Sequence, residues 1–548
     1  MVGGESVTKT LVDVLKHAAD ECNNIEKRFI RIFKDHKQFY EIPYSLLYER
    51  AKKLATAFSG KGIKKNDYVI FQIGDMPEYL YTFWACEFIG AIPVPLPVNI
   101  RRFEATESSK KVNNVRTLLE GSFLIYGDSN ASMYGNADER NINISKLMLK
   151  IDSYDSYEKE NAEEDDIAFV QFSSGSTSNP KGVVLKHKNI IKNMEQISER
   201  LPLNGVKCCA NWMPLTHDMG FIAFHLMPMK HSSNAILYST ELFMRNPLDF
   251  LKCVGETKSE FIGLSNSMID IILKLMKVKK VDNLDLSALK FILNGSEPIS
   301  CKSANLFLEV FKPYGLPENS MCYCYGMAEA SLVVSVMEKS DNPSLRVNER
   351  DYYQEIITLD EDSEMEIPLV GKPLLDLEVI ILDHNGVIRK ENEIGEICIR
   401  GKNVMDGYLN IENNDFFTAD GYFRTGDKGF LSDGKIAVIG RIKDIVFKNG
   451  VNYYSHDLER IVGEIYPEMI NKCAAVQVNE KGKGNRIVLF INDAENADAK
   501  CRHINAEMVK KVGFMFEKFI QTDNFPRTMG GKIRRFKLAD QYETEIRE

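Results

Sequence analysis

The sequence predicts an α/β protein: a large N-terminal domain of parallel α/β sheets plus a β-rich subdomain, followed by a small α/β C-terminal domain. Short apolar segments alternate with helical patterns along most of the chain, which is typical of parallel sheets covered by helices. From about residue 371, short strands and tight turns such as His384–Asn385–Gly386 replace this alternation. A chain of 548 residues is also longer than one compact domain.

The first α/β repeat is expected near the N-terminal end. Residues 44–59 carry Leu47, Leu54 and Phe58 at helical spacing, which predicts an amphipathic helix. Three further elements complete the repeat: a strand at 67–73, a helix at 77–89 and a strand at 91–94. The pattern recurs later, with strands predicted at 166–172 and 289–293.

The domain organisation follows from these changes of pattern. We expect a large N-terminal domain at residues 1–441, with the β-rich subdomain at about 371–440, and a small C-terminal domain at residues 442–548. The stretch 152–166 is rich in Asp, Glu, Ser and Asn and is expected to be a surface linker within the large domain. A second acidic stretch, 361–366, falls in a long insertion.

Composition excludes several function classes. The formal net charge of −9 argues against a general binder of nucleic acid or membrane surfaces, because such proteins need a basic field. The most apolar stretch, residues 83–98, contains Glu87 and three prolines, so no stable membrane insertion is expected. No secretory signal is visible. The eleven cysteines lack CxxC spacing, and we interpret them as reduced core residues of a cytoplasmic protein.

A run of Ser, Thr and Gly residues follows the predicted strand at 166–172. Such residues let backbone N–H groups and hydroxyls converge on one point, and Lys181 adds a cation, which suits polyphosphate. A flexible linker is the alternative for this loop taken by itself. It is not a Walker loop, because Gly182 follows the lysine. The expected phosphate-binding residues are Ser173, Ser174, Gly175, Ser176, Thr177 and Lys181.

This loop resembles the phosphate-binding loop of the adenylate-forming superfamily, which contains acyl-CoA synthetases, fatty acyl-AMP ligases, luciferases and the adenylation domains of peptide synthetases. Other segments resemble further superfamily motifs in the same order. They are Asn294-Gly295-Ser296-Glu297-Pro298, Tyr325-Gly326-Met327-Ala328-Glu329-Ala330, Thr425-Gly426-Asp427, Gly440-Arg441-Ile442-Lys443-Asp444 and Pro526-Arg527-Thr528-Met529-Gly530-Gly531-Lys532. Ordered matches over nearly the whole chain make this resemblance specific.

The resemblance implies that the protein uses ATP and Mg²⁺. A carboxylate must attack the α-phosphorus in line with departing pyrophosphate, and both reactants are anionic. By resemblance, Glu329 is the Mg²⁺ ligand, with Thr177 nearby, and Asp427 accepts hydrogen bonds from the ribose hydroxyls with help from Arg441. Tyr325 is expected to stack on adenine. The remaining nucleotide-binding residues that the resemblance implies are Gly295, Ser296, Glu297 and Pro298, which border the base, and Gly326 and Met327.

Lys532 is the strongest catalytic candidate. The Gly530–Gly531 pair before it favours a flexible loop that inserts a lysine into a cleft, and by resemblance Lys532 bridges the substrate carboxylate and the α-phosphate. Lys443 matches the hinge position of the superfamily, about which the small, mobile C-terminal domain would swing after the first step. The cations after Lys532 are expected to form a solvated basic face: Arg534, Arg535 and Lys537.

Other segments resemble fatty acyl-AMP ligases more closely than CoA ligases. Residues 212–220 resemble their W-x-P-x-x-H-D-M-G segment, which makes His217 a second catalytic candidate near the acyl carboxylate. A polar core histidine is the alternative, and Asp218 has the alternative role of a structural cap. The Met- and Phe-rich stretch at 219–229 fits an apolar acyl chain and equally fits ordinary core. A long insertion between Glu329 and residue 371 resembles one that is linked in these ligases to poor use of CoA.

The sequence therefore predicts a fatty acyl-AMP ligase. It would convert a fatty acid and ATP to acyl-adenylate and pyrophosphate, and then pass the acyl group to the phosphopantetheine thiol of an acyl carrier protein in trans. The alternative is a fatty acyl-CoA ligase with CoA as acceptor. An amino- or aryl-acid-activating enzyme is less favoured, because no F-D-x-S segment pairs a substrate ammonium. A non-enzymatic scaffold would be expected to lack Lys532, Glu329 or the phosphate loop.

Overall fold

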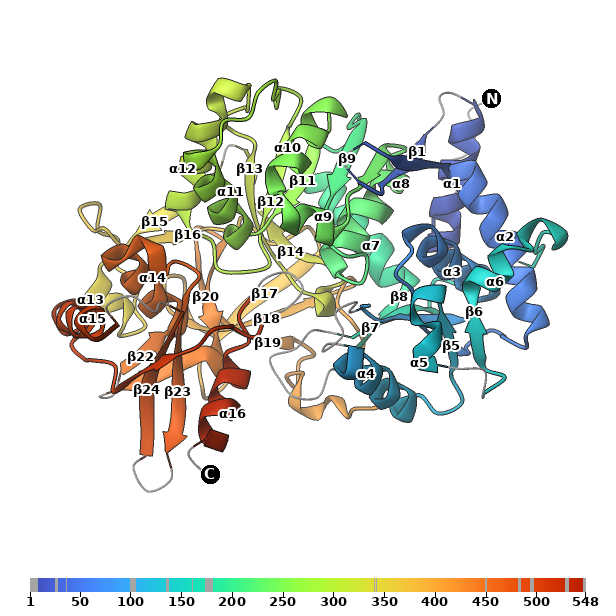
Figure 1. Cartoon of the computed structure of the whole chain (residues 1–548). Coiled ribbons are helices and arrows are strands. Elements are labelled where there is room, and N and C mark those ends of the chain that lie inside the picture. Colours follow the sequence, from blue (N-terminus) through green and yellow to red (C-terminus); the bar gives the residue numbers. More distant parts are fainter. Residues whose placement is uncertain are drawn as a thin grey trace.

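A computed structural model describes residues 8–24, 28–35, 37–98, 105–134, 138–159, 161–172, 181–339, 341, 343–448, 451–480, 484–492, 497–527 and 532–545. The large N-terminal part contains two α/β sheets, and a β-rich region and a smaller α/β part follow it (Figure 1). The predicted fold class is therefore confirmed.

An eight-stranded sheet forms the centre of the large part. The strands from β13 to β1 run parallel, while β14 and β2 pair antiparallel at the two edges. In spatial order they are β14 (Val333–Val336), β13 (Met321–Gly326), β12 (Phe291–Asn294), β11 (Phe261–Leu264), β9 (Cys208–Asn211), β10 (Asn234–Leu237), β1 (Phe29–Phe33) and β2 (Phe39–Pro43). Strands β9, β11 and β12 are buried at every position, as expected for parallel strands covered on both faces.

A second sheet of four parallel strands contains the predicted N-terminal repeat. Its order is β4 (Ile92–Pro95), β3 (Tyr68–Gln72), β5 (Phe123–Tyr126) and β6 (Asn141–Asn143). Helix α3 (Met76–Ile89) joins β3 to β4 and is buried from Tyr79 to Ile89. It begins at Asp75, whose carboxylate accepts the N–H of Glu78, and ends at Gly90 with a left-handed backbone. A helix with apolar residues on all faces has to be enclosed in this way.

The other helices of the large part connect the strands and cover the sheets (Figure 1). They are α1 (Leu11–Asn24), α2 (Tyr44–Gly60), α4 (Ala105–Leu118), α5 (Ala131–Tyr134), α6 (Ile144–Met148), α7 (His187–Arg200), a π-helix (Met219–Leu226), α8 (Met227–Lys230), α9 (Thr240–Arg245), α10 (Pro247–Glu256), α11 (Asn266–Val278) and α12 (Cys301–Phe311). The predicted helix at 44–59 is confirmed as α2, which buries Leu47, Leu54 and Phe58.

The strand predicted at 166–172 exists, but it belongs to neither parallel sheet. It forms β7 (Ile167–Phe172), which pairs antiparallel with β8 (Gly182–Lys186). The parallel arrangement predicted from the recurring pattern is therefore wrong for this strand. β7 is buried at five of six positions. A strand that is buried in this way needs an apolar sequence whether it belongs to a hairpin or to a parallel sheet, so the apolar run does not distinguish the two. The Ser- and Gly-rich run thus joins the two strands of a hairpin.

The predicted β-rich region forms an antiparallel sheet of four strands in sequence order. These are β17 (Leu377–Leu382), β18 (Gly395–Gly401), β19 (Phe423–Ser432) and β20 (Lys435–Arg441). The insertion before this sheet contains β15 (Ser344–Arg346), α13 (Glu349–Tyr352) and β16 (Glu366–Pro368). Its buried residues share one cluster with Phe430 and Ile439 of the sheet and with Tyr454 beyond it.

The C-terminal part has its own cores. It contains the antiparallel pair β21 (Ile445–Lys448) and β22 (Val451–Tyr454), the three-stranded sheet β23 (Cys473–Glu480), β24 (Gly484–Ile491) and β25 (Lys518–Gln521), and the helices α14 (Ser455–Ile465), α15 (Ala497–Val512) and α16 (Arg535–Glu545). Two apolar clusters lie within this part. The insertion contacts it directly, since Tyr352 donates its hydroxyl to the buried carboxylate of Asp457 at 2.9 Å.

The cysteines match the prediction closely. All eleven lie in described residues, none forms a disulfide, and ten are buried; the thiol of Cys501 is half-buried. Within the described ranges, no helix combines the length and the apolar character needed to cross a membrane.

Candidate active site

A triad of two buried residues, Tyr325 and Asp427, and one half-buried residue, Arg441, joins the end of β13 to the antiparallel sheet. Asp427 on β19 and Arg441 at the end of β20 are direct register partners, and their side chains form an ion pair with Nε–Oδ1 at 2.8 Å. Tyr325 of β13 donates its hydroxyl to the other oxygen of Asp427 at 2.7 Å. Strand pairing brings Asp427 and Arg441 together, and the hydrogen bond from Tyr325 adds the third residue that the sequence predicted at the ribose and adenine.

The charges of this triad are mutually stabilised. The carboxylate of Asp427 raises the pKa of Arg441, which keeps the guanidinium charged. Burial, and then the same carboxylate, raises the pKa of Tyr325, so its phenol stays protonated and continues to donate. Asp427 is only 4% exposed. Its carboxylate oxygens still have lone pairs that neither Tyr325 nor Arg441 uses, and these can accept hydrogen bonds from ribose hydroxyls.

The turn after β12 packs tightly against β13. A Cβ on Gly295 would lie 2.7 Å from the carbonyl oxygen of Cys324, so only glycine fits there. Ser296 adopts a left-handed backbone with φ of 69° and is exposed, as is Pro298. This turn is therefore a rigid, partly exposed edge beside Tyr325.

Glu297 has a structural contact that the sequence analysis did not anticipate. Its two carboxylate oxygens accept hydrogen bonds from the backbone N–H and the hydroxyl of Ser267, in the first turn of α11. Burial raises the pKa of Glu297, while the helix contacts and Lys532 favour the charged form. The carboxylate thus caps a helix at the border of the candidate site.

The other predicted residues of the β13 motif serve the backbone. A Cβ on Gly326 would lie 1.9 Å from the carbonyl oxygen of Leu332, which explains glycine at this position. Met327 is buried. Both residues hold the turn that leads to Glu329.

Glu329 lies beside the end of the predicted phosphate loop. Its Oε1 accepts the hydroxyl of Tyr408 at 2.7 Å. Burial raises its pKa, Asp218 acts in the same direction, and the Tyr408 hydrogen bond and Arg441 oppose the shift. Lys181 sits over the rings of Phe416 and Tyr408, with Nζ 3.9 Å and 4.8 Å from the ring centroids. Its pKa is lowered by burial and by Lys443, and Glu329 acts the other way. The five loop positions predicted with it, Ser173, Ser174, Gly175, Ser176 and Thr177, lie outside the described residues.

Lys532 approaches this site from the C-terminal part. Its pKa is lowered, first by burial and then by Arg441, whereas Asp427 and Asp444 favour the charged form. The same lysine also acts on Glu297. The ammonium therefore lies in the electrostatic field of the residues predicted to hold ribose and adenine, although more than 90 residues separate it from Arg441 in the sequence.

Arg535 corrects the prediction of a solvated basic face. Its guanidinium forms two hydrogen bonds with the carboxylate of Glu459, at 2.9 Å and 2.6 Å, and lies 3.6 Å from Asp444. The side chains of Arg535 and Glu459 are only 14% and 15% exposed. The prediction is wrong here because the partner carboxylate lies on a distant helix, α14. Glu459 also accepts the N–H of Ala475 at 2.9 Å, which ties β23 to the same point.

The predicted hinge follows β20 directly. Lys443 lies in a short 3₁₀ turn, Ile442–Asp444, and its side chain is exposed. Asp444 is already attached to the C-terminal part, since its carbonyl oxygen accepts the hydroxyl of Ser455 at 2.9 Å. The segment between the two attachments is therefore short, from Arg441 to Lys443.

His217 and Asp218 form a half-buried pair with Nδ1–Oδ1 at 2.7 Å. Burial lowers the pKa of His217, but the carboxylate of Asp218 more than offsets this, so the pKa is raised overall. Asp218 also accepts the N–H of Met219 at 2.7 Å at the start of the π-helix, which bears out its structural alternative as a cap. The charge of Asp218 also contributes to the raised pKa of Glu329.

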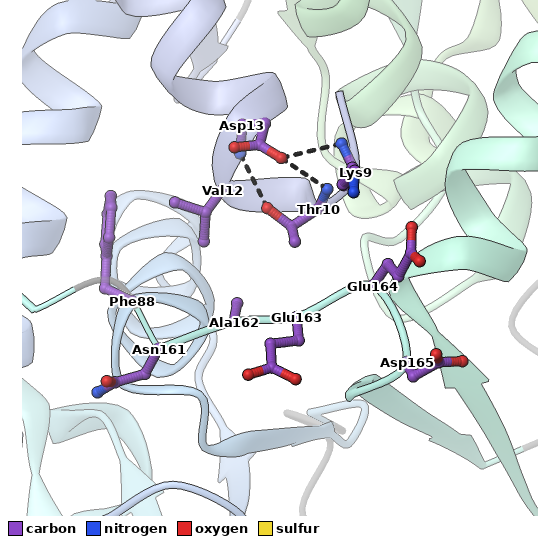
Figure 2. Close-up of a pocket in the computed structure, with 10 residues that line it drawn as sticks. All are labelled: Lys9, Thr10, Val12, Asp13, Phe88, Asn161, Ala162, Glu163, Glu164 and Asp165. Atoms are coloured by element: carbon purple, nitrogen blue, oxygen red, sulfur yellow. Dashed lines mark hydrogen bonds between the residues drawn. The ribbon is translucent and has the colours of Figure 1, made fainter. Parts of the chain in front are cut away.

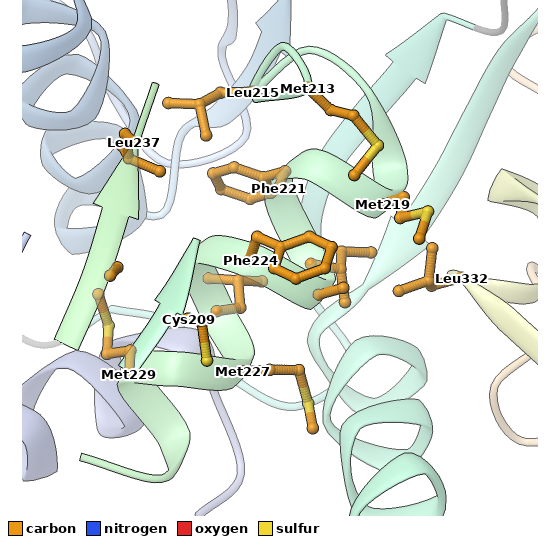
Figure 3. Packing of buried hydrophobic residues seen from close by; sticks show 14 of the residues in the cluster. Cys209, Met213, Leu215, Met219, Phe221, Phe224, Met227, Met229, Leu237 and Leu332 are labelled. Carbon is orange, nitrogen blue, oxygen red and sulfur yellow. The ribbon is translucent and has the colours of Figure 1, made fainter. Parts of the chain in front are cut away.

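The Met- and Phe-rich stretch is core in this structure. Figure 3 shows Met219, Phe221, Phe224 and Met227 packed against neighbouring apolar residues, and all are buried. A Cβ on Gly263 would lie within 2.9 Å of Met213, Met219 and Phe224, so these side chains fill the space beside β11. Of the two interpretations left open by the sequence, the structure supports core packing.

A separate pocket of about 450 Å³ lies at the start of α1. Figure 2 shows it between Lys9–Asp13, the side chain of Phe88 and the acidic segment 161–165. Asp165 is paired with Lys188 at 2.6 Å, and Asp13 accepts the N–H groups of Lys9 and Thr10. None of the predicted site residues lines this pocket.

The fold and the site define an adenylate-forming enzyme. Residues 23–409 match the AMP-binding enzyme family, and the chain belongs to that family. It is 25% identical to the medium-chain-fatty-acid–[acyl-carrier-protein] ligase JamA of Moorena producens, over 98% of this chain and 97% of that protein.

Solved structures agree with this assignment. One from a study of fatty acyl-adenylate ligases of E. coli and L. pneumophila superposes with a TM-score of 0.87 at 26% identity, covering 98% of both chains. The L. pneumophila fatty acyl-adenylate ligase in complex with acyl adenylate and pyrophosphate gives a TM-score of 0.75 at 25% identity, covering 98% of this chain and 96% of that one.

The sequence analysis missed two groups of residues. Tyr408 and Phe416, which contact Glu329 and Lys181, stand in segments without a distinctive charge or metal-ligand pattern. Glu459 lies in a segment, residues 452–459, that also resembles fatty acyl-AMP ligases, but its pairing with Arg535 was not predicted, because 76 positions separate the two residues. The sequence feature that could have drawn attention to Tyr408 is the Gly407–Tyr408 pair after β18, but a glycine at such a position by itself predicts only a loop.

Proposed function

We propose that this protein activates a fatty acid with ATP to an acyl-adenylate, releases pyrophosphate and transfers the acyl group to the phosphopantetheine thiol of an acyl carrier protein. The observation that carries the proposal is the convergence of Lys532 with Tyr325, Asp427 and Arg441. Such a convergence supplies a ribose acceptor and a cation for the reacting carboxylate and α-phosphate in one place.

The nucleotide is assigned to the large part. Asp427 accepts the ribose hydroxyls, with Arg441 holding its carboxylate, and the exposed edge of the 295–298 turn with Tyr325 borders the base. Lys181 and the loop before it take the β- and γ-phosphates. The preformed triad supports this assignment, because groups fixed before binding lose little entropy when the ligand arrives.

The residues around Glu329 fit Mg²⁺ carried by ATP. Mg²⁺ prefers one or two carboxylates together with phosphate oxygens. Glu329 is a half-buried carboxylate close to Lys181, the cation that is predicted to bind the phosphates. In the described ranges no group of three or more metal-binding side chains gathers, so a dedicated protein cage is not part of the proposal. Glu329, with Thr177 as predicted, would hold the ion, which neutralises phosphate charge when bound.

Lys532 is assigned to the chemical step. Its ammonium would pair with negative charge on the attacking carboxylate and the α-phosphate as that charge grows in the transition state. His217, held by Asp218, would orient the acyl carboxylate from the other side. Lys443 would act as the hinge on which the C-terminal part, proposed at residues 442–548, withdraws Lys532 before thioester formation.

Relatives support the substrate and the acceptor. JamA is a medium-chain fatty acid ligase for an acyl carrier protein, and the structural neighbours include fatty acyl-adenylate ligases. A cytoplasmic location is part of the proposal and is supported by eleven cysteines that form no disulfide.

Acid-dependent ATP–pyrophosphate exchange tests the first half of the proposal. We expect exchange with medium- or long-chain saturated fatty acids and none with amino acids or benzoate. Exchange with amino or aryl acids alone would contradict the proposal. Each acid is tested with the Lys532→Ala variant as the blank, so that exchange by a contaminating enzyme is recognised.

A further inference from the structure

One segment of the large part connects the two charges predicted to hold the triphosphate and its metal. Met405 donates its N–H to the carbonyl oxygen of Glu329 at 2.8 Å, and Leu409 donates its N–H to the carbonyl oxygen of Gly182 at 2.8 Å. Between them, Tyr408 forms a β-bridge with Val183 of β8. The backbone of 405–409 is therefore fixed both to the Glu329 turn and to the strand that begins just after Lys181.

Tyr408 contacts both charges with different parts of its side chain. Its hydroxyl donates to Oε1 of Glu329 at 2.7 Å, and the ammonium of Lys181 lies 4.8 Å from its ring centroid. Phe416 completes the surface under the lysine, at 3.9 Å, and packs edge-on against Tyr408 with ring centroids 4.9 Å apart. The phenol acts on the carboxylate and the two rings act on the cation.

This arrangement keeps opposite charges available. In the described part of the chain, Lys181 and Glu329 form no direct ion pair, although the carboxylate of Glu329 acts to raise the pKa of Lys181. A direct pair would use the cation needed for phosphate and the carboxylate needed for Mg²⁺. A tyrosine between them satisfies both groups with weaker contacts, which a nucleotide and its metal ion displace or supplement easily.

We propose that Tyr408 is a positioning residue that holds Lys181 and Glu329 at a fixed separation. Its hydroxyl orients Glu329, and its ring, together with that of Phe416, holds the ammonium of Lys181. The inference rests on the proposed function of this site and deepens it, because it assigns the orientation of Glu329 to the hydroxyl of Tyr408 and the placement of Lys181 to the rings of Tyr408 and Phe416.

Two substitutions separate the two contacts. Tyr408→Phe removes the hydroxyl and keeps the ring, whereas Phe416→Leu removes the closer ring and keeps the hydroxyl. Calorimetric titration of the purified full-length protein with ATP, once in EDTA and once with Mg²⁺, measures the two roles directly and does not depend on turnover.

We expect opposite patterns. In Tyr408→Phe, ATP affinity in EDTA stays near the wild-type value, and the gain in affinity on adding Mg²⁺ falls about tenfold, as is usual for a residue that supports a metal ligand. In Phe416→Leu, ATP affinity in EDTA falls about fivefold, since a cation–π contact is lost, and the gain on adding Mg²⁺ is unchanged.

The chain offers a matched control outside the site. Tyr422 donates its hydroxyl to Glu378 at 2.7 Å and lies under Arg400 at 4.3 Å, which is the same pair of contacts on the surface. Tyr422→Phe should leave both titrations unchanged. In exchange assays, the two site variants should raise the KM for MgATP and leave kcat nearly unchanged, whereas a merely destabilised protein would lose active sites at constant KM.

Wild-type affinities in Tyr408→Phe under both conditions would overturn the inference, as would tighter ATP binding by Phe416→Leu, because the rings would then hold Lys181 away from phosphate. Failure of the proposed function has a different signature. It would be seen in the wild-type protein as absence of fatty-acid-dependent exchange, whatever the two variants do in calorimetry.

Discussion

The two sides of the candidate active site are built differently. The nucleotide side is assembled within the large part, where strand pairing sets Asp427 opposite Arg441 and a buried hydrogen bond adds Tyr325. Lys532, the lysine that we propose to be catalytic, comes from the C-terminal part, and the backbone of the two parts is joined through the short Arg441–Lys443 segment. The nucleotide side is therefore fixed by strand pairing within the large part, whereas the position of Lys532 depends on where the C-terminal part lies.

This difference separates binding from chemistry. ATP affinity should depend mainly on the large part, and the rate of adenylation should depend mainly on the position of Lys532. An enzyme with two half-reactions gains from such a division, because the lysine can leave without disturbing the bound adenylate. Substitutions on the two sides should therefore affect different measurements.

The largest effect is expected from Lys532→Ala. Loss of a cation that acts on the transition state should lower kcat for ATP–pyrophosphate exchange by about 100-fold or more, with ATP affinity nearly unchanged. Lys537→Ala, which removes a cation of α16 five positions further on, is the matched control and should retain exchange. Unchanged exchange in Lys532→Ala would refute the assignment of this lysine.

Arg535→Gln tests whether the C-terminal part must hold Lys532 rigidly. It leaves the carboxylate of Glu459 buried without its guanidinium, which should cost about 3 kcal/mol in the free energy of unfolding of this part. Chemical denaturation followed by circular dichroism measures that loss. ATP affinity should stay at the wild-type level, and reduced affinity would contradict the separation of the two sides.

Asp427→Asn affects the nucleotide side. The amide keeps a hydrogen bond from Tyr325 but loses the charge that pairs with Arg441, so we expect a loss of about 2 kcal/mol in the free energy of unfolding together with weaker ATP binding. Glu378→Gln is the control, because its ion pair with Arg400 is exposed and should contribute less than about 1 kcal/mol. Full ATP affinity in Asp427→Asn would contradict the ribose role.

The smallest effect is expected from pH. The pKa of His217 is raised above its ordinary value of 6.5 because Asp218 outweighs burial. A raised histidine pKa stabilises the fold fully below the unfolded value, and this stabilisation disappears as pH rises through the folded value. Unfolding measured over a pH series that rises from below 6.5, the ordinary pKa of histidine, should therefore show a small loss of stability on the alkaline side. His217→Gln should abolish that loss, and the exposed His384→Gln should retain it.

Local patterns were sufficient for much of the fold. The helix at 44–59 is visible from its apolar spacing, and the buried helix at 77–89 from a continuous apolar run between local caps, because both signals are encoded within one segment. Strand β7 was also found, but its antiparallel partner was not, since a buried apolar run is compatible with either direction of pairing. The direction of pairing depends on the partner strand, and the hydrophobic pattern of a single segment carries no information about that partner.

The site shows the same division. Lys181, Asp427, Arg441 and Lys532 were named because each lies in a motif with its own residue pattern. Arg535 was assigned to solvent because its buried partner lies 76 positions earlier, and Tyr408 was missed because its carboxylate partner lies 79 positions earlier. Contacts between residues that only the tertiary fold brings together produce no recognisable spacing pattern in the sequence.

The central claim is that the protein delivers fatty acyl groups from an adenylate to a carrier protein. The most direct test is one reaction containing the enzyme, MgATP, a fatty acid that supports exchange, a holo acyl carrier protein and CoA, with both thioesters measured by mass spectrometry. We predict that acyl-carrier protein is the main product and that Lys532→Ala forms neither thioester from the free acid. Acyl-CoA formed as fast as or faster than acyl-carrier protein would contradict the claim.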